Sequence, residues 1–194
     1  MMIDRLDHTK RLEVLLYVAS RVGCVSRIHT IIYFANRYHL ERYGRFVIND
    51  LAVIRNDEIV LLILHNMISG LGKKFYHYQE IKDSLKYHIR QSGARMLTPK
   101  RIANFDYLSD SDIECLNEAI GKIKSMSPNE LILFSHDDLF MASYPNRVIT
   151  LHKMVDHSFN ADELREYISS FYIPKILYVK LAEQQGSYLH NEDN

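Results

Sequence analysis

Residues 31–45 read Ile-Ile-Tyr-Phe-Ala-Asn-Arg-Tyr-His-Leu-Glu-Arg-Tyr-Gly-Arg, and this stretch decides the predicted fold. Its apolar residues recur every three or four positions, as on one face of an α-helix. The apolar stripe begins upstream and consists of Ile28, Ile31, Ile32, Ala35 and His39, flanked by Phe34 and Tyr38. Ser26 offers an N-cap, and Gly44 stands where a left-handed C-cap belongs. The pattern therefore predicts a helix over residues 27–43.

Another helix is predicted just upstream, over residues 7–22. Its apolar stripe consists of Leu12, Leu15, Leu16, Ala19 and Val22. Gly23 can end this helix, so the two helices should form a hairpin. That shape resembles a DNA-binding helix–turn–helix, but helical hairpins are far more common than DNA readers.

The residues downstream of this hairpin predict β-structure and one buried helix. Residues 45–56 are extended and partly apolar, as in a short strand or a loop on the core. Residues 57–69 predict a buried helix capped by Asp57 and ended by Gly70 or Gly72. A strand is the alternative for Ile59–Leu64, because β-branched residues are frequent in that run. Residues 87–98 predict a β-hairpin that turns at Ser92-Gly93.

Later helices are marked by their start signals. Ser109 is followed by an acid three residues on, Ser127 is followed by Pro128 and Glu130, and Asn160 opens a further helix that Pro174 interrupts. We therefore expect a mainly α protein, a single helical domain with a small β-hairpin and a C-terminal helical arm. The domain should span residues 1–145, and residues 146–194 should pack on it or project from it.

Composition excludes several classes of protein. The 194 residues carry 24 Lys+Arg and 24 Asp+Glu, and this zero net charge argues against a generic nucleic-acid binder. Two distant cysteines, Cys24 and Cys115, indicate neither a disulfide framework nor a metal site. Ile59–Leu64 is the longest apolar run, far short of the roughly 20 residues that cross a bilayer. Residues 1–10 lack the apolar region of a signal peptide, so we expect a cytoplasmic protein.

The zero net charge conceals a polarised chain. Residues 1–45 hold eight basic and four acidic residues, whereas residues 100–140 hold four basic and eight acidic residues. The two regions therefore carry +4 and −4. We expect them to attract each other within the fold, with His39–Arg45 packed against Ser135–Asp138. The alternative is a partner site of one sign.

Catalytic and metal-binding motifs are missing from the sequence. It contains no HExxH, no paired CxxC, no phosphate-binding GxxxxGK[ST] and no GxSxG. The ten histidines are scattered, so we expect no metal and no cofactor. Ser135-His136-Asp137 are adjacent and point in different directions, so they cannot form a relay and should bracket a helix end. His39 lies on an apolar stripe, which is typical of a hydrogen-bonded core histidine.

One further segment allows two interpretations. Residues 73–86 interleave cations with aromatic rings, a pattern that can hold nucleic acid or an anionic protein surface. A solvated connecting segment with its rings turned inward is the alternative that we favour, because the whole chain is neutral.

Two stretches resemble a known family. Ile31–Arg45 is similar to the "LLYFADRxHLxxYGRP" signature of the SocA-like antitoxin family, also called the Panacea domain, and Asp50 matches the Asp of its "GD" step. Leu108–Ile113 and Ser135–Asp138 are similar to its "LSxxD" helix and its "[ST]HEE" step. The resemblance covers roughly residues 6–140. Asn36, Phe46 and Asn49 depart from the pattern, and Glu58-Ile59-Val60 replaces the family's "GPV".

The resemblance implies a mainly helical, non-enzymatic protein that binds a partner. Members of the family are commonly antitoxins that neutralise a cognate toxin by direct binding, and at least one kind delivers its toxin to an AAA+ protease. The alternative is a DNA- or RNA-binding regulator that uses the N-terminal helical hairpin. A homodimer is left open.

The candidate partner-binding or motif residues are His39, Arg42, Tyr43, Arg45, Asp50, His136 and Asp137. In one interpretation Arg45 pairs with Asp50 and fixes the chain reversal after Gly44, and in the other His39, Arg42 and Arg45 face a partner. A third hypothesis is an enzyme in which His39, Asp50 and His136 converge in one cleft. Variable recognition is expected in the hairpin 87–98 and in the arm 159–186, which carries Tyr167, Phe171, Tyr172 and Tyr178.

Overall fold

The computed structural model describes residues 2–69, 85–92, 95–145 and 147–172. In chain order its elements are α1 (Met2–Ala19), α2 (Val25–Tyr43), β1 (Ala52–Arg55), β2 (Glu58–Leu61), α3 (Leu62–Ser69), β3 (Ile89–Ser92), β4 (Met96–Pro99), the 3₁₀ turn η1 (Phe105–Tyr107), α5 (Asp110–Ile123), α6 (Pro128–Ser135), α7 (Asp138–Ser143), β5 (Val148–Ile149), α8 (Leu151–Asp156), α9 (Ala161–Tyr167) and the π-helical turn η2 (Ile168–Tyr172). The protein is mainly helical with small antiparallel sheets, which confirms the expected fold class.

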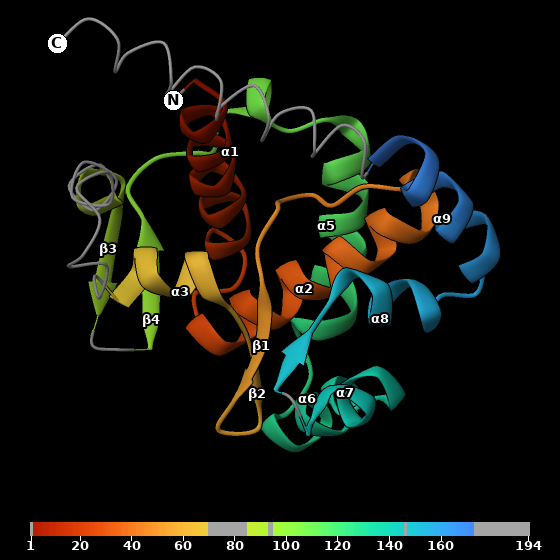
Figure 1. The fold of residues 1–194 in the computed structure, drawn as a ribbon. Helices are drawn as coiled ribbons and strands as arrows, with labels where there is room; N and C mark the ends of the chain where they lie inside the picture. Colours follow the sequence, from red (N-terminus) through yellow and green to blue (C-terminus); the bar gives the residue numbers. More distant parts are fainter. Residues whose placement is uncertain (1, 70–84, 93–94, 146, 173–194) are drawn as a thin grey trace, which may run out of the picture.

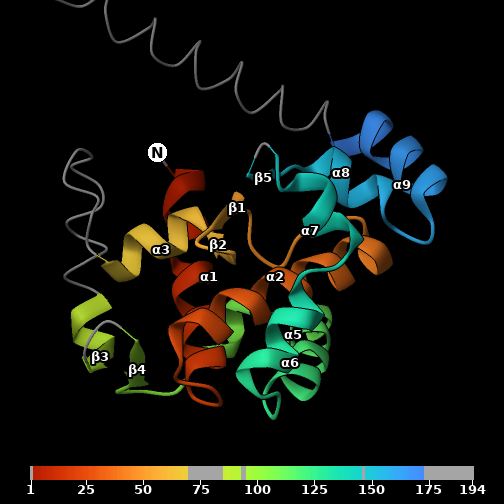
Figure 2. The same cartoon turned by 90° about the horizontal axis from the view of Figure 1, so that it is seen from below.

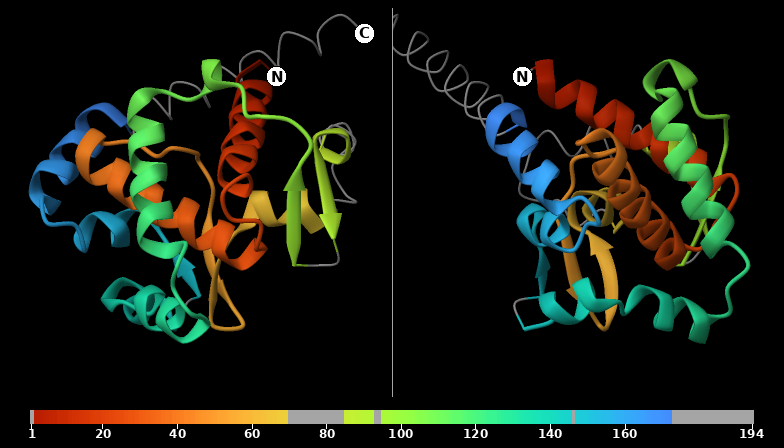
Figure 3. Two further views of the ribbon diagram at one scale, coloured as in Figure 1. Left: turned by 180° about the vertical axis from the view of Figure 1, so that it is seen from behind. Right: turned by 90° about the vertical axis from the view of Figure 1, so that its right-hand side faces the viewer.

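Helix α2 forms the centre of the molecule (Figure 1), and α5 lies along it (Figure 3). The predicted stripe is buried, since Ile28, Ile31, Ile32 and Ala35 are all inaccessible to solvent. Gly44 ends the helix with φ +66° and donates its N–H to Leu40 O, which confirms the predicted left-handed cap. Helix α2 instead begins at Val25, and its N-cap residue Cys24 makes no side-chain capping bond.

Two start signals are confirmed in full. Ser109 and Asp112 form a reciprocal capping box at the start of α5, and Ser127 and Glu130 form another at α6, with Pro128 in its first turn. These signals are local, so neighbouring residues are sufficient to specify them.

The helix predicted over residues 57–69 is wrong in its first half. Residues 58–61 form β2, which pairs antiparallel with β1, and only Leu62–Ser69 are helical. Asn56 and Asp57 have φ values of +49° and +60°, so Asp57 lies in a two-residue hairpin turn and does not cap a helix. Strand β5 pairs with the other edge of β1 and completes the sheet order β2-β1-β5.

A second, two-stranded sheet is the predicted hairpin, formed by β3 and β4. Gly23 lies against β4, where a Cβ atom would come within 2.8 Å of Leu97 O. Leu97 N donates to Gly23 O at 2.8 Å, and Val25 N donates to Arg95 O at 2.9 Å. Figure 2 shows this hairpin on one side of the molecule and α8 and α9 on the other.

Helix α9 packs near the end of α2. Tyr167 lies against Gly44, where a Cβ atom would come within 2.5 Å of its ring, and Asn160 donates from Nδ2 to Glu41 O at 3.0 Å. Asn160 makes no side-chain capping bond to α9. The expected features at Gly70, Gly72, residues 73–84, the turn residue Gly93, Pro174 and the rest of the arm lie outside the described residues.

No helix among the described residues is long and apolar enough to cross a membrane. Cys115 is buried and Cys24 is half-buried, and neither is in a disulfide.

Candidate functional site

Asp112, in the first turn of α5, is the centre of a buried ionic cluster. Its side chain is 0% exposed and lies 2.7 Å from Lys10 Nζ and 3.2 Å from Arg45 Nη1. It also accepts the backbone N–H of Ser109 at 3.0 Å. Burial raises the pKa of Asp112, but the bonds from Lys10 and Ser109 outweigh it and bring the pKa below its ordinary value. This carboxylate therefore ties α1 and the end of α2 to the start of α5.

His39, on α2, is the fully buried histidine that its position on the stripe predicts. Its Nδ1 lies 2.8 Å from the carbonyl oxygen of Arg45, and its Nε2 lies 3.0 Å from Ser111 Oγ. Because a carbonyl can only accept, the partners assign the proton to Nδ1 and leave Nε2 to accept from Ser111. Burial lowers the pKa of His39, which favours the neutral ring.

Arg42 and Tyr43 continue the same contact towards the surface. Arg42 Nη1 lies 3.1 Å from Glu114 Oε1, and Nη2 bonds to Glu118. Tyr43 donates from its hydroxyl to Glu114 Oε2 at 2.8 Å. Exposed ion pairs contribute about 0–1 kcal/mol each. The network orients α5 along α2 more than it stabilises the fold.

The predicted pair between Arg45 and Asp50 is wrong. Arg45 bonds to Asp112, whereas Asp50 accepts the backbone N–H groups of Ile63 and Leu64 at 2.8 and 2.9 Å. Asp50 therefore caps the N-terminus of α3 from a distant segment. Burial raises the pKa of Asp50 despite these two bonds.

His136 and Asp137 bracket the junction of α6 and α7, as their adjacency predicts. Asp137 is the N-cap of α7, accepts the N–H of Phe140 at 2.9 Å and forms an ion pair with Arg37. His136 donates from Nε2 to Asp57 O at 2.8 Å, and its ring stacks on Phe140 with centroids 4.1 Å apart. These contacts hold the helix junction against the β1–β2 turn.

The basic N-terminal region does pair with the acidic region 100–140. The pairs are Lys10–Asp112, Arg37–Asp137, Arg42–Glu114, Arg42–Glu118 and Arg45–Asp112. The expected contact between His39–Arg45 and Ser135–Asp138 is wrong in detail, because His39–Arg45 contacts α5 and it is Arg37 that meets Asp137.

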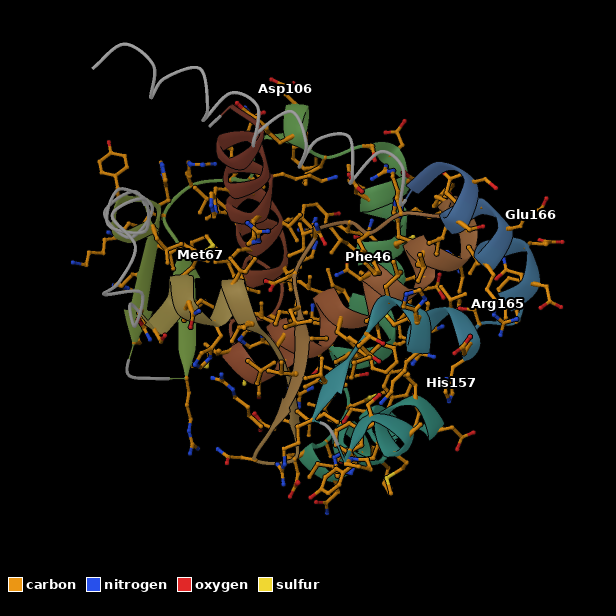
Figure 4. All side chains as sticks on the ribbon, in the orientation of Figure 1. Phe46, Met67, Asp106, His157, Arg165 and Glu166 are labelled. Carbon is orange, nitrogen blue, oxygen red and sulfur yellow. The ribbon has the colours of Figure 1, made fainter. Side chains whose placement is uncertain are left out.

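Among the residues that the structure describes, the three residues of the enzyme hypothesis share no hydrogen-bond partner. His39 bonds to Arg45 and Ser111, Asp50 to the start of α3, and His136 to the β1–β2 turn. A cavity of about 200 Å³ lies between α3 and the β3–β4 hairpin, and none of the three residues lines it. Figure 4 shows Met67, one of its lining residues, on α3. Among the described residues, no three His, Cys, Asp or Glu side chains gather as a metal site.

Sequence reasoning missed Lys10 and the central position of Asp112. The capping box identified Asp112 as the residue that closes the N-terminus of α5, but capping gives no sign of a second, long-range role. Lys10 lies on α1 and is far from Asp112 in sequence, so only the folded arrangement of α1 and α5 brings the two side chains together.

The fold is a helical domain in which ion pairs and hydrogen bonds from Arg42, Tyr43 and Arg45 fix the end of α2 to α5. The family model described as "Antitoxin SocA-like, Panacea domain" matches residues 30–139, which is more than half of the chain, and the chain belongs to this family. The matched range contains all seven candidate residues. Comparison with curated proteins and with solved structures gave no match.

Proposed function

We propose that this protein is an antitoxin that binds and neutralises a partner toxin directly, without a catalytic step of its own. Membership of the SocA-like family supports this function. The observation that carries the proposal is that all seven motif residues make polar contacts within the chain. Residues that hold α2, α5, α3 and α7 in place support a scaffold for binding more than a reactive centre.

If the motif builds the scaffold, recognition uses other surfaces. Two lie at opposite ends of the molecule, at the β3–β4 hairpin and at α8–α9 (Figure 2). Both expose large side chains: Tyr87 and Met96 at the hairpin, and Phe159 and Tyr167 at the other end. Aromatic residues and Met are enriched at protein interfaces. Figure 4 shows the charged Arg165 and Glu166 on α9 beside the second surface.

Growth rescue tests the proposed function. The product of the gene adjacent to this one is expressed alone, with this protein, or with an empty vector in a bacterial host. We expect the neighbouring product to arrest growth and this protein to restore it, with the two proteins co-purifying. Growth arrest that this protein does not relieve, together with no complex, would reject the proposal.

A DNA- or RNA-binding regulator is not favoured, because α2, the second helix of the N-terminal hairpin, packs into the protein core. Of the residues of α2, 11 are buried. Its arginines contact other parts of the chain: Arg27 bonds to the carbonyl groups of Ile123 and Met126, and Arg37 and Arg42 pair with acids. A recognition helix needs an exposed polar face for the base edges.

On this proposal the protein binds the toxin in the cytoplasm.

Delivery of the bound toxin to an AAA+ protease is a further step that the proposal permits. A degradation assay with purified protease tests it, because an adaptor would accelerate loss of the toxin while remaining intact. Sedimentation equilibrium tests a homodimer.

A further inference from the structure

The β3–β4 hairpin presents one face to solvent, and its register identifies the residues on that face. Arg90 pairs with Thr98 and Ser92 with Met96, so these four side chains share one face. Lys100 lies two residues beyond Thr98 and therefore joins them. All five are exposed. We call Arg90, Ser92, Met96, Thr98 and Lys100 the basic hairpin face.

Acidic residues are missing from this part of the chain. Residues 85–104 contain five Lys and Arg and no Asp or Glu. Arg101 is neutralised by Glu13 through a 2.6 Å contact. Arg90 has no acidic partner among residues 2–69, 85–92, 95–145 and 147–172, and Lys100 donates from Nζ only to a carbonyl, that of Lys86. The arginines of α2, by contrast, are paired with acids or bonded to carbonyls.

The hairpin is anchored to the rest of the protein. The opposite side of the hairpin is buried through Ile89 and Leu97, which are 5% and 3% exposed. Backbone hydrogen bonds tie Leu97 to Gly23 and Arg95 to Val25. A surface that is already ordered loses little conformational entropy when a partner binds.

We propose that the basic hairpin face binds an extended acidic segment of the partner protein. Arg90 and Lys100 are diagonal neighbours, for which the spacing is about 7–8 Å. Side chains two residues apart in an extended chain are about 6.6 Å apart and point the same way. A segment with carboxylates at alternate positions therefore reaches both cations. That the partner is the toxin rests on the proposed function.

A protein fits this face better than a nucleic acid does. Met96 lies among the polar residues of the face, and the exposed Tyr87 precedes β3. Arg, Met and Tyr are residue types enriched at protein interfaces. Two cations neutralise few phosphates, and nucleic-acid affinity at physiological salt comes mostly from many such contacts.

Fluorescence anisotropy tests the chemistry of the face directly. The probes are a labelled peptide of six Glu-Thr repeats, its Gln-Thr counterpart and a 20-base-pair DNA duplex. The proteins are the wild type, the double variant Arg90→Glu/Lys100→Glu and the control Arg147→Glu, which alters an exposed arginine in the turn before β5. Thermal melting checks that each variant folds.

We expect the wild type to bind the Glu-Thr peptide at least tenfold more tightly than the Gln-Thr peptide. The double variant should lose at least tenfold in affinity, and Arg147→Glu should stay within twofold of the wild type. Absence of Glu-Thr binding, an unchanged double variant, or tighter binding to the duplex than to the peptide would overturn the inference.

The neighbouring gene product separates this inference from the proposed function. We expect the folded double variant to bind that protein at least tenfold more weakly than the wild type does. Equal binding by both would overturn the inference and leave the antitoxin function standing. Peptide binding by the wild type without binding to the neighbouring product would count against the function and not against the face.

Discussion

At the scale of single residues, Asp112 joins three segments of the chain. Its fully buried carboxylate forms ion pairs with Lys10 and Arg45 and accepts a hydrogen bond from the backbone N–H of Ser109. Burying a charge costs free energy unless the charge is paired and hydrogen-bonded. The folded state therefore depends on the partners of Asp112.

Asp112→Asn should destabilise the protein by about 1–3 kcal/mol, because the buried carboxylate that accepts from Lys10, Arg45 and Ser109 is lost while the two cations stay partly exposed to solvent. Urea unfolding measures this change. Asp110→Asn is the matched control: Asp110 is exposed in the same turn of α5, and its loss should cost less than about 1 kcal/mol. Equal effects of the two substitutions would contradict a buried cluster.

His29 makes stability depend on pH. Burial and the nearby His65 lower the pKa of His29 from 6.5 to about 4. At pH values between about 4 and 6.5, His29 is therefore mostly protonated in the unfolded chain and mostly neutral in the folded protein. Stability from this group is therefore present above pH 6.5 and is lost as the pH falls towards 4. The expected loss between pH 7 and pH 5 is about 2 kcal/mol.

Urea unfolding at pH 7 and pH 5 measures this loss, with His29→Gln as the comparison. The pKa values of His39 and His65 are also lowered, so they act in the same direction and the variant should keep part of the slope. A variant that loses as much stability on acidification as the wild type would contradict the assignment to His29.

Single-residue environments could be predicted only where they depend on local sequence. His39 was identified as a core residue because it lies on an apolar stripe. The partner of Arg45 was not, because Asp50 is close in sequence whereas Asp112 comes from the other helix, 67 positions away. Nothing in the local pattern marks such a long-range ionic contact.

At the scale of elements, helix ends were predicted better than the boundary between strand and helix. Capping boxes and the Gly44 cap depend on residues within one turn. The run Ile59–Leu64 fits either a buried helix or a strand, and pairing with β1 decides its first part. Asn56 and Asp57, which favour left-handed turns and lie between two β-branched runs, were the missed hairpin signal.

Gly44→Ala tests two features of one glycine. A side chain there must adopt φ +66° and displace the ring of Tyr167, which should cost about 2–3 kcal/mol. Gly121→Ala is the control, because Gly121 lies in α5 with open space around it. That change should stabilise the protein by about 0.5–1 kcal/mol. Thermal melting measures both changes. Equal melting temperatures for Gly44→Ala and Gly121→Ala would contradict the packing of α9 on α2.

At the scale of the whole molecule, the opposite charges of two regions explain how distant segments meet. Pairs between residues 10–45 and 112–137 join α1 and α2 to α5 and α7. This pairing could be predicted from the net charges, but which residues pair could not, because a charge count carries no geometry.

Several described residues after residue 145 belong to the same hydrophobic core as the rest of the protein. The buried apolar side chains after residue 145 are Ile149, Met154, Val155, Leu164 and Ile168. Burial of such side chains contributes about 1.5–3 kcal/mol each, and the sum for the five matches the whole stability of an ordinary domain.

A chain that ends at Pro145 should therefore lose cooperative thermal unfolding. A cooperative transition near that of the full chain would instead make residues 1–145 an independent domain.

Direct binding between the two purified proteins tests the antitoxin function most directly. This protein and the product of its neighbouring gene are mixed at equal, micromolar concentrations and separated by size-exclusion chromatography coupled to light scattering. We predict one peak that contains both chains at a defined ratio. Two separate peaks at the masses of the free proteins would contradict it.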